Sequence, residues 1–181
     1  MAELIQGKDF IAFFRRVKDQ KKQDAGKVRF QTELTLNAEK EVETTKTKDG
    51  VVNSVSDGET SGEFTSLAYR EDKDTVNMWK EMRKWFRNTD KIEVWIVDLA
   101  SKFEDAGKEK YDVEYYQGFF KNFEISAPAD DKVELTYEVA IDGNGVISTD
   151  TLTESQKSAI NKAQYDYHTL AKEGDGTGLP A

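Results

Sequence analysis

Few residue types in this chain could carry catalysis. His168 is its single histidine and it has no cysteine, so His-based metal clusters, thiolate sites and disulfides lack their ligands. One histidine also leaves few ways to build a nucleophile–base triad. No Gly-x-x-x-x-Gly-Lys-Ser/Thr run is present to cradle a phosphate. We therefore expect His168 to be an exposed or packing residue.

Oxygen ligands and paired acids are the remaining routes to chemistry. Asp142-Gly-Asn144-Gly145 resembles the start of a calcium loop, which needs a Glu at its twelfth position, and here that position is Thr153. The segment therefore predicts a turn. The acids are numerous enough for a paired-carboxylate hydrolase. Nearly all of them fall in loops or on the polar phase of strands, where nothing tunes their pKa. We expect no enzyme, no cofactor and no metal.

The charge balance excludes some partners. A formal net charge of −9 argues against binding phosphates or anionic membrane surfaces through clustered Lys and Arg. Met1–Gln6 is followed by Gly-Lys-Asp without a continuous apolar run, and no run approaches the length of a membrane span. We expect a soluble product made in the cytoplasm.

The elements that must position any site are mostly strands. Val28, Phe30, Leu34 and Leu36 alternate with polar residues, which is typical of a half-buried strand. The polar stretch 18–27 before them predicts a loop. Alternation or aromatic and β-branched enrichment predicts strands at 8–17, 28–36, 64–69, 92–97, 113–120, 123–126 and 132–141.

The segment from about 37 to 62 has almost no apolar residues. Thr44–Lys48 and Val51–Val55 flank Asp49-Gly50, a strong hairpin signal, and Asp57-Gly58 predicts a second turn. Two strands with little to bury predict an arm that projects from the body and that a partner covers. A disordered surface loop is the alternative.

Two helices are predicted. Asp74 can cap a helix over 75–87, whose apolar stripe packs on the core and whose basic residues lie toward its C-terminal end. The packing residues are Trp79, Met82, Trp85 and Phe86. Thr153 and Gln156 have capping-box spacing before a second helix, Glu154 to about Ala171. We expect a single domain over 1–181, with an N-terminal arm at about 1–7 and a flexible tail at about 172–181.

Aromatic residues crowd residues 103–123. Tyr115, Tyr116, Phe119 and Phe120 fall on both faces of one predicted strand. Burial on both faces indicates a core on one side and a neighbouring subunit on the other.

From Trp95 onward the chain resembles the major tail protein family of siphophages, whose members form the tube of long non-contractile tails. The resemblance follows a series of short motifs in order over about 60 residues. They are Trp95-Ile-Val-Asp98-Leu99-Ala100, Lys110-Tyr111, Tyr115-Tyr116-Gln117-Gly118-Phe119, Phe123-Glu124, Ala127-Pro128-Ala129-Asp130-Asp131, Val133-Glu134-Leu135, Gly143-Asn144-Gly145 and Thr151-Leu152-Thr153. The first 90 residues match only in general character, and the segment after Thr153 matches less well.

The resemblance implies a mainly β (α+β) fold: a β-sandwich or barrel with a flanking helix and a long projecting hairpin. It implies a virion protein that forms stacked hexameric rings around the tape-measure protein, through which double-stranded DNA later passes. Tail terminator and initiator or baseplate proteins are the implied partners at the ends. The hairpin and the termini would bridge successive rings, with Lys46, Thr47, Lys48, Asp49, Gly50, Val51 and Val52 as the contact residues.

Two other functions remain open from the residues alone. One is a monomeric β-sandwich that binds a small molecule or a host protein through the hairpin. The other is a small hydrolase that uses Asp and Glu. Concentration-dependent assembly discriminates the tube subunit from the monomeric module.

Overall fold

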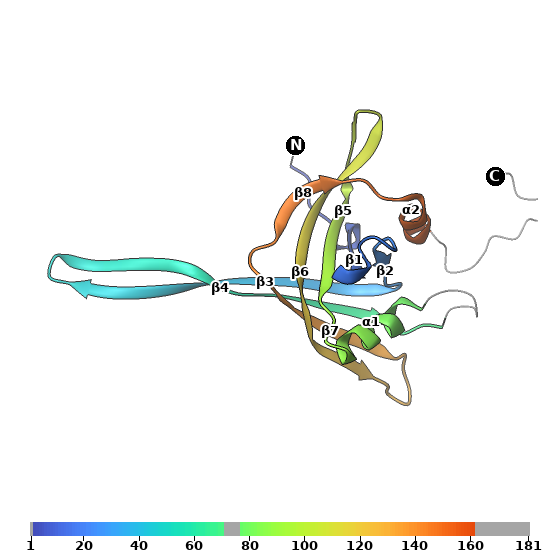
Figure 1. Ribbon diagram of the computed structural model, residues 1–181, viewed down its shortest axis with the longest axis horizontal. Coiled ribbons are helices and arrows are strands. Elements are labelled where there is room, and N and C mark those ends of the chain that lie inside the picture. Colours follow the sequence, from blue (N-terminus) through green and yellow to red (C-terminus); the bar gives the residue numbers. More distant parts are fainter. Residues whose placement is uncertain (1, 71–76, 162–181) are drawn as a thin grey trace, which may run out of the picture.

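The computed structural model describes residues 2–70 and 77–161, which form an antiparallel sheet with two helices (Figure 1). The strands are β1 Phe10–Arg16, β2 Gly26–Lys27, β3 Gln31–Thr47, β4 Gly50–Leu67, β5 Ile92–Asp105, β6 Lys108–Ser126, β7 Glu134–Ile141 and β8 Val146–Asp150. The helices are α1 Met78–Arg87 and α2 Glu154–Asn161, with short 3-10 turns η1 Gly7–Asp9 and η2 Val17–Asp19. His168, the predicted tail and the predicted helix beyond Asn161 lie outside the described residues. None of the described helices is long and apolar enough to cross a membrane.

The strands pair in the order β2-β1-β5-β6-β7-β4-β3, and every pair is antiparallel. β6 is long, and different parts of it pair with different neighbouring strands. β5 pairs along one of its edges as far as Gly118, whereas β8 and then β7 pair along the other edge. The sheet therefore has a β2-β1-β5-β6 half and a β6-β7-β4-β3 half that share one strand.

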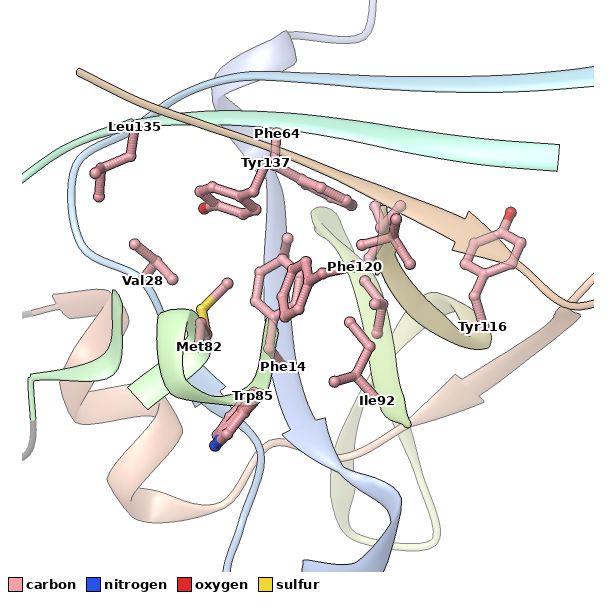
Figure 2. Packing of buried hydrophobic residues seen from close by; sticks show 14 residues of the cluster. Phe14, Val28, Phe64, Met82, Trp85, Ile92, Tyr116, Phe120, Leu135 and Tyr137 are labelled. Atoms are coloured by element: carbon pink, nitrogen blue, oxygen red, sulfur yellow. The ribbon is translucent and has the colours of Figure 1, made fainter. Parts of the chain in front are cut away.

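β3, the strand at one end of the order, contacts β1 near the other end through a side chain. Gln31 on β3 accepts a hydrogen bond from the Ala12 N–H on β1 at 2.9 Å and donates to the Ala12 carbonyl at 2.8 Å. The Gln31 side-chain amide thus makes the two hydrogen bonds to the Ala12 backbone that a neighbouring strand would otherwise make. The curled sheet encloses an aromatic core in which Phe14 contacts Phe64 edge-on, with ring centroids 5.1 Å apart (Figure 2).

Helix α1 packs on this core. Met82 and Trp85 are buried in it, as the figure shows, while Trp79 and Phe86 are partly buried against it. The Trp79 indole N–H is satisfied by the Tyr69 carbonyl at 2.9 Å. All four side chains thus occupy the side of the helix that faces the body.

A second, smaller cluster lies on the other side of the sheet. Phe13, Val97 and Val113 are buried there, and Leu152 and Ile160 at α2 pack over them. The predicted capping box at the start of α2 is confirmed: the Thr153 N–H donates to the Gln156 side chain at 2.9 Å, and the Gln156 N–H donates to the Thr153 hydroxyl at 3.3 Å.

One prediction about β4 was wrong, and another was right in part. The turn at Asp57-Gly58 does not form, whereas the strand expected at 64–69 is present over residues 64–67 as the end of one long strand. Asp57 lies opposite Lys40 and pairs with it, and a register shift between Ala38 and Lys40 absorbs the extra residue. A bulge lets a strand continue through a sequence that could also turn.

Other boundaries also differ from the sequence expectation. Residues 99–111 extend β5 and β6 into a hairpin that turns at Ala106-Gly107, both with positive φ (50° and 75°). Strand β8 was not predicted. Phe30 has a φ of 57°, so β3 begins at Gln31 instead of Val28. The N-cap of α1 is Asn77, and the predicted cap Asp74 lies outside the described residues.

Candidate functional site

The β6-β7-β4-β3 half of the sheet presents one face to the core and the opposite face to solvent. Leu135, Tyr137 and Val139 point inward from β7, so Glu134, Thr136 and Glu138 point outward. Strand register carries this alternation to the neighbouring strands, where a residue paired with an outward residue also points outward.

Carboxylates gather on this outward face, which we call the acidic face. Its acids are Glu33, Glu63, Glu124, Glu134 and Glu138, and they alternate with Thr35, Ser61, Thr65, Asn122 and Thr136. Glu63 lies directly opposite Glu138, an unfavourable like-charge pair. The Lys121 ammonium lies 3.4 Å from a Glu138 carboxylate oxygen and offsets part of this negative charge. Such a face repels phosphates and offers hydroxyl and amide groups to whatever lies against it.

Sequence reasoning did not assign these five carboxylates to a common face. The alternation over residues 133–139 marks Glu134 and Glu138 as polar-phase residues. Their neighbours on other strands follow only from register, because a shift of one residue turns every side chain of a strand to the opposite face.

The same half of the sheet has two open edges. Within the described residues no strand pairs with the outer edge of β3, and Phe119–Ser126 of β6 pair with β7 alone. Adjacent strands alternate in direction, so the outermost two of these four strands run antiparallel to each other. Unpaired N–H and C=O groups along such edges are templates for pairing with another chain.

Beyond the body, β3 and β4 continue as a two-stranded arm, residues 38–60 (Figure 1). The predicted tip residues, Lys46 to Val52, are all exposed around the turn at Asp49-Gly50. Gly50 has a φ of 136°, a conformation that other residues rarely adopt. The predicted hairpin turn is confirmed, and a contact role for these residues stays a prediction.

The two sides of the arm differ in character. Val42 lies opposite Val55, and Val51 shares their side; these three residues form the valine face, and they are 60–64% exposed. Glu41 and Glu43 point from the other side, here called the acidic side. The ribbon has no core of its own, so the single chain leaves these three valines in contact with water.

The aromatic candidates on β6 divide between environments. Tyr116 and Phe120 belong to the core. Tyr115 packs on Trp95, with ring centroids 5.2 Å apart, while Phe119 is 38% exposed on the outward side. Their role between subunits stays a prediction.

A polar network lies beneath Tyr115 on the other half of the sheet. Burial raises the pKa of the Tyr115 hydroxyl, which donates to Glu93 at 2.7 Å. Arg15 donates to the other Glu93 oxygen at 2.9 Å and stacks over the Trp95 ring. Glu93 is therefore a buried, fully engaged ion-pair partner and is poorly placed to act as a free base.

A cleft of about 280 Å³ borders this network between β1, β5 and the segment before α2. Phe13, Trp95 and Val97 line it, together with the exposed Asp24 and Asp150. No group of three His, Cys, Asp or Glu residues able to hold a metal occurs in the part of the chain that the structure describes.

The chain is similar to tail proteins over nearly its whole length. It is 27% identical over 178 residues to the "Putative tail protein" of Staphylococcus phage phiMR25, covering 98% of this chain and 89% of the relative. Its fold matches the SPP1 tail tube with a TM-score of 0.65 at 17% identity, over 94% of both chains.

Two further tube structures share the fold at lower similarity. The tail of an empty gene transfer agent particle matches 81% of this chain and 99% of its own, with a TM-score of 0.54 at 12% identity. The PVC sheath–tube complex, an extracellular contractile injection system, matches 82% of this chain and 93% of its own, with a TM-score of 0.53 at 12% identity. The family model of the phage tail tube protein matches residues 4–149, so the chain belongs to the phage tail tube protein family and is a structural component of the virion tail.

Proposed function

We propose that copies of this chain form hexameric rings that stack into a tube, through which the phage genome passes. The observation that carries this proposal is the pair of open, antiparallel edges on β3 and on Phe119–Ser126 of β6. The β3 edge of one copy pairs with the β6 edge of the next, a heterologous contact that closes into a ring when the rotation matches. Ring closure removes both exposed edges at once.

The number six comes from a structural relative. The tail of the gene transfer agent particle has C6 symmetry. Four strands from each of six copies give a barrel larger than the porins, whose roughly 16–18 strands already leave an aqueous channel. Strand count and symmetry together therefore support a tube with an open lumen.

The acidic face lines the lumen in this arrangement. Curling brings the core side of the four strands against the rest of each subunit, which leaves the carboxylate side facing the channel. Like charge keeps DNA phosphates from binding to the wall, so the genome slides. Hydroxyl and amide groups between the carboxylates contact the tape-measure protein before DNA enters.

The arm connects successive rings. Its tip residues, Lys46 to Val52, reach the neighbouring ring, and the valine face is buried in that contact. The terminal segments contribute to the same contact. Rings at the two ends of the stack keep one uncovered surface each, and there the tail terminator and the initiator or baseplate proteins bind.

Disulfide trapping tests the edge pairing directly, because the chain has no cysteine of its own. Thr35→Cys on β3 and Glu124→Cys on β6 lie on the acidic face at the two open edges. We expect mild oxidation of concentrated protein to give a ladder of linked subunits that ends at six. Cysteine at Glu33 or Asn37 on β3, combined with cysteine at Asn122 or Ser126 on β6, tests other registers of the pairing between copies.

Negative-stain microscopy of the unmodified chain provides the second readout. Rings or hollow tubes at high concentration are expected, and deletion of Glu39–Gly58 should leave rings that do not stack. A matched control, Lys108→Cys with Glu124→Cys, places one thiol far from either edge and should give no ladder. Strictly monomeric protein under all conditions, with no ladder from any edge pair, would overturn the proposal.

A further inference from the structure

The charges of this acidic chain are unevenly distributed. Residues 78–91 carry five Lys or Arg and only two acids, although the whole chain has a net charge of −9. The arm has the opposite balance, with six acids and three lysines in residues 38–60. Lys40 and Asp57 pair with each other at the base of the arm, whereas Glu41 and Glu43 are exposed on its acidic side.

Most of these basic residues lie on the exposed side of α1. Helix α1 turns its apolar side to the core and its charged side to solvent, where Lys84 pairs with Glu81 at 2.6 Å. Arg83 and Arg87 are exposed, and neither has an acidic partner within the described residues. The turn after β1, whose Lys18 pairs with Asp90 just after α1, carries the exposed Lys21 and Lys22. We call this surface, formed by Lys21, Lys22, Lys80, Arg83 and Arg87, the basic end.

Contacts between α1 and that turn fix the basic end as one unit. The Arg16 guanidinium lies over the Trp85 ring, 5.8 Å from its centroid. The Val17 N–H donates to the Lys91 carbonyl at 3.0 Å, and Lys18 pairs with Asp90 at 2.6 Å. The start of the turn is thus held against the C-terminal end of α1, and within the turn the Lys22 N–H donates to the Asp19 carbonyl at 2.9 Å.

The basic end and the arm lie at opposite ends of the same pair of strands. β3 starts and β4 finishes beside α1, and the arm tip is at the far end of this ladder (Figure 1). The arm, about ten residues per strand, reaches roughly 30 Å beyond the body at about 3.3 Å per residue. Copies repeated along this direction bring the arm of each one to the basic end of the next.

We propose that the acidic side of the arm, through Glu41 and Glu43, docks on the basic end of a second copy, through Arg83 and Arg87. This rests on the stacked rings of the proposed function and names the surface that receives the arm. Charge complementarity fixes the polarity of the stack, because an arm meets repulsion from the acidic arm or acidic face of a copy placed the other way round. Each contact is modest, and a ring repeats it once per subunit.

Charge reversal in both partners tests the pairing. Either Glu41→Lys/Glu43→Lys or Arg83→Glu/Arg87→Glu should raise the critical concentration for tube growth at least about tenfold. Combining all four changes in one chain should restore it to within about threefold of the unmodified protein. The control Lys102→Glu/Lys108→Glu alters as much charge on the β5–β6 hairpin and should leave tube growth unchanged. Sedimentation and negative-stain tube lengths measure the effect.

Thiol trapping identifies the contact independently of its strength. A mixture of Glu43→Cys and Arg83→Cys chains should give a mixed disulfide dimer, whereas Glu43→Cys with Lys108→Cys should not. If the unmodified chain forms rings but no tubes grow, stacking itself fails, and the pairing fails with it. Two outcomes would overturn the pairing alone, once the unmodified chain forms tubes. In one, either charge-reversed variant stacks like the unmodified chain. In the other, combining all four changes does not restore tube growth. Capture of DNA by the basic end, without the mixed dimer, would also contradict it.

Discussion

Phe64 and Val55 lie on the same strand and have opposite surroundings. Phe64 is 3% exposed, and its ring packs edge-on to Phe14 and stacks on Tyr137. Val55 is 64% exposed and lies opposite Val42 on the arm. One hairpin ladder thus runs from a packed core to a ribbon that has only its own two strands.

The two halves of β3 and β4 depend on different sources of stability. An isolated two-stranded ribbon is marginal in water, whereas strands that bury a hydrophobic face are not. The body half is stabilised by its core in a single chain. The arm half gains comparable support only when another molecule covers it. Substitutions in the body should therefore act on folding, and substitutions in the arm should act on assembly.

Truncating the core side of β4 should have the largest effect on folding. Phe64→Ala removes a ring that contacts Phe14 and Tyr137. We expect the free energy of unfolding to fall by about 3–5 kcal/mol, as for other buried aromatic truncations. Urea denaturation of the dilute monomer measures it. Phe64→Leu keeps much of the volume and should cost clearly less; a loss below about 1 kcal/mol for the alanine variant would contradict the core assignment.

A close approach between strands of the body should have the next largest effect. An added Cβ at Gly118 would lie 1.9 Å from the Ala140 carbonyl oxygen. Gly118→Ala therefore forces β6 and β7 apart and should destabilise the monomer by about 1–3 kcal/mol. The matched control is Gly7→Ala, because no atom lies within 4 Å of a Cβ added there. Equal unfolding midpoints for the two variants would show that the strands adjust without strain.

The arm and the helices were the parts of the fold that local sequence could predict. Asp49-Gly50 predicts its turn because few residues other than glycine adopt the backbone conformation seen at Gly50. The stripe of Met82 and Trp85 predicts a buried helix face through its own periodicity. The Thr153 and Gln156 pair predicts its cap for the same local reason.

The acidic face and the open edges could not be predicted in the same way. Glu63 and Glu138 are far apart in sequence and become neighbours only through the β4–β7 register. The turn expected at Asp57-Gly58 was wrong because the pairing of Asp57 with Lys40 favours a continuous strand. Pairing between strands far apart in sequence therefore determines which carboxylates share the acidic face. Pairing between β3 and β4 likewise explains why the turn predicted at Asp57-Gly58 does not form.

The ion pairs of Asp90 with Lys18 and Arg16 should contribute less to the free energy of unfolding than the packing of the core does. Burial alone would raise the pKa of Asp90, but hydrogen bonds from Lys18 and Arg16 outweigh it and hold that pKa below its ordinary value. A depressed carboxyl pKa stabilises the fold above pH 4 or so and loses this contribution as the pH falls through the folded-state pKa. Asp90→Asn should therefore destabilise the monomer by about 1 kcal/mol at pH 7.

The pH dependence separates this ion pair from a packing effect. The difference between Asp90→Asn and the unmodified chain should shrink between pH 5 and pH 2 or so, as urea denaturation at several pH values would measure. The exposed Asp57 on the arm also has a lowered pKa, caused by Lys40 and then by Asn144. Asp57→Asn should not measurably change the unfolding of the monomer. A constant difference for Asp90→Asn at all pH values would mean that its charge is not what stabilises the body.

Substitutions in the valine face should have the smallest effect on the free energy of unfolding, in contrast to Phe64→Ala. Val42→Ser/Val55→Ser removes apolar surface that the single chain leaves exposed, so the free energy of unfolding of the dilute monomer should change by no more than about 0.5 kcal/mol. The critical concentration for tube growth should nevertheless rise several-fold, because the contact between rings loses the apolar area that it buries. Thr44→Ser on the same side removes only one methyl group and serves as the control. A large loss of monomer stability would mean that the arm is stabilised within its own chain, whereas unchanged tube growth would mean that no partner covers the valines.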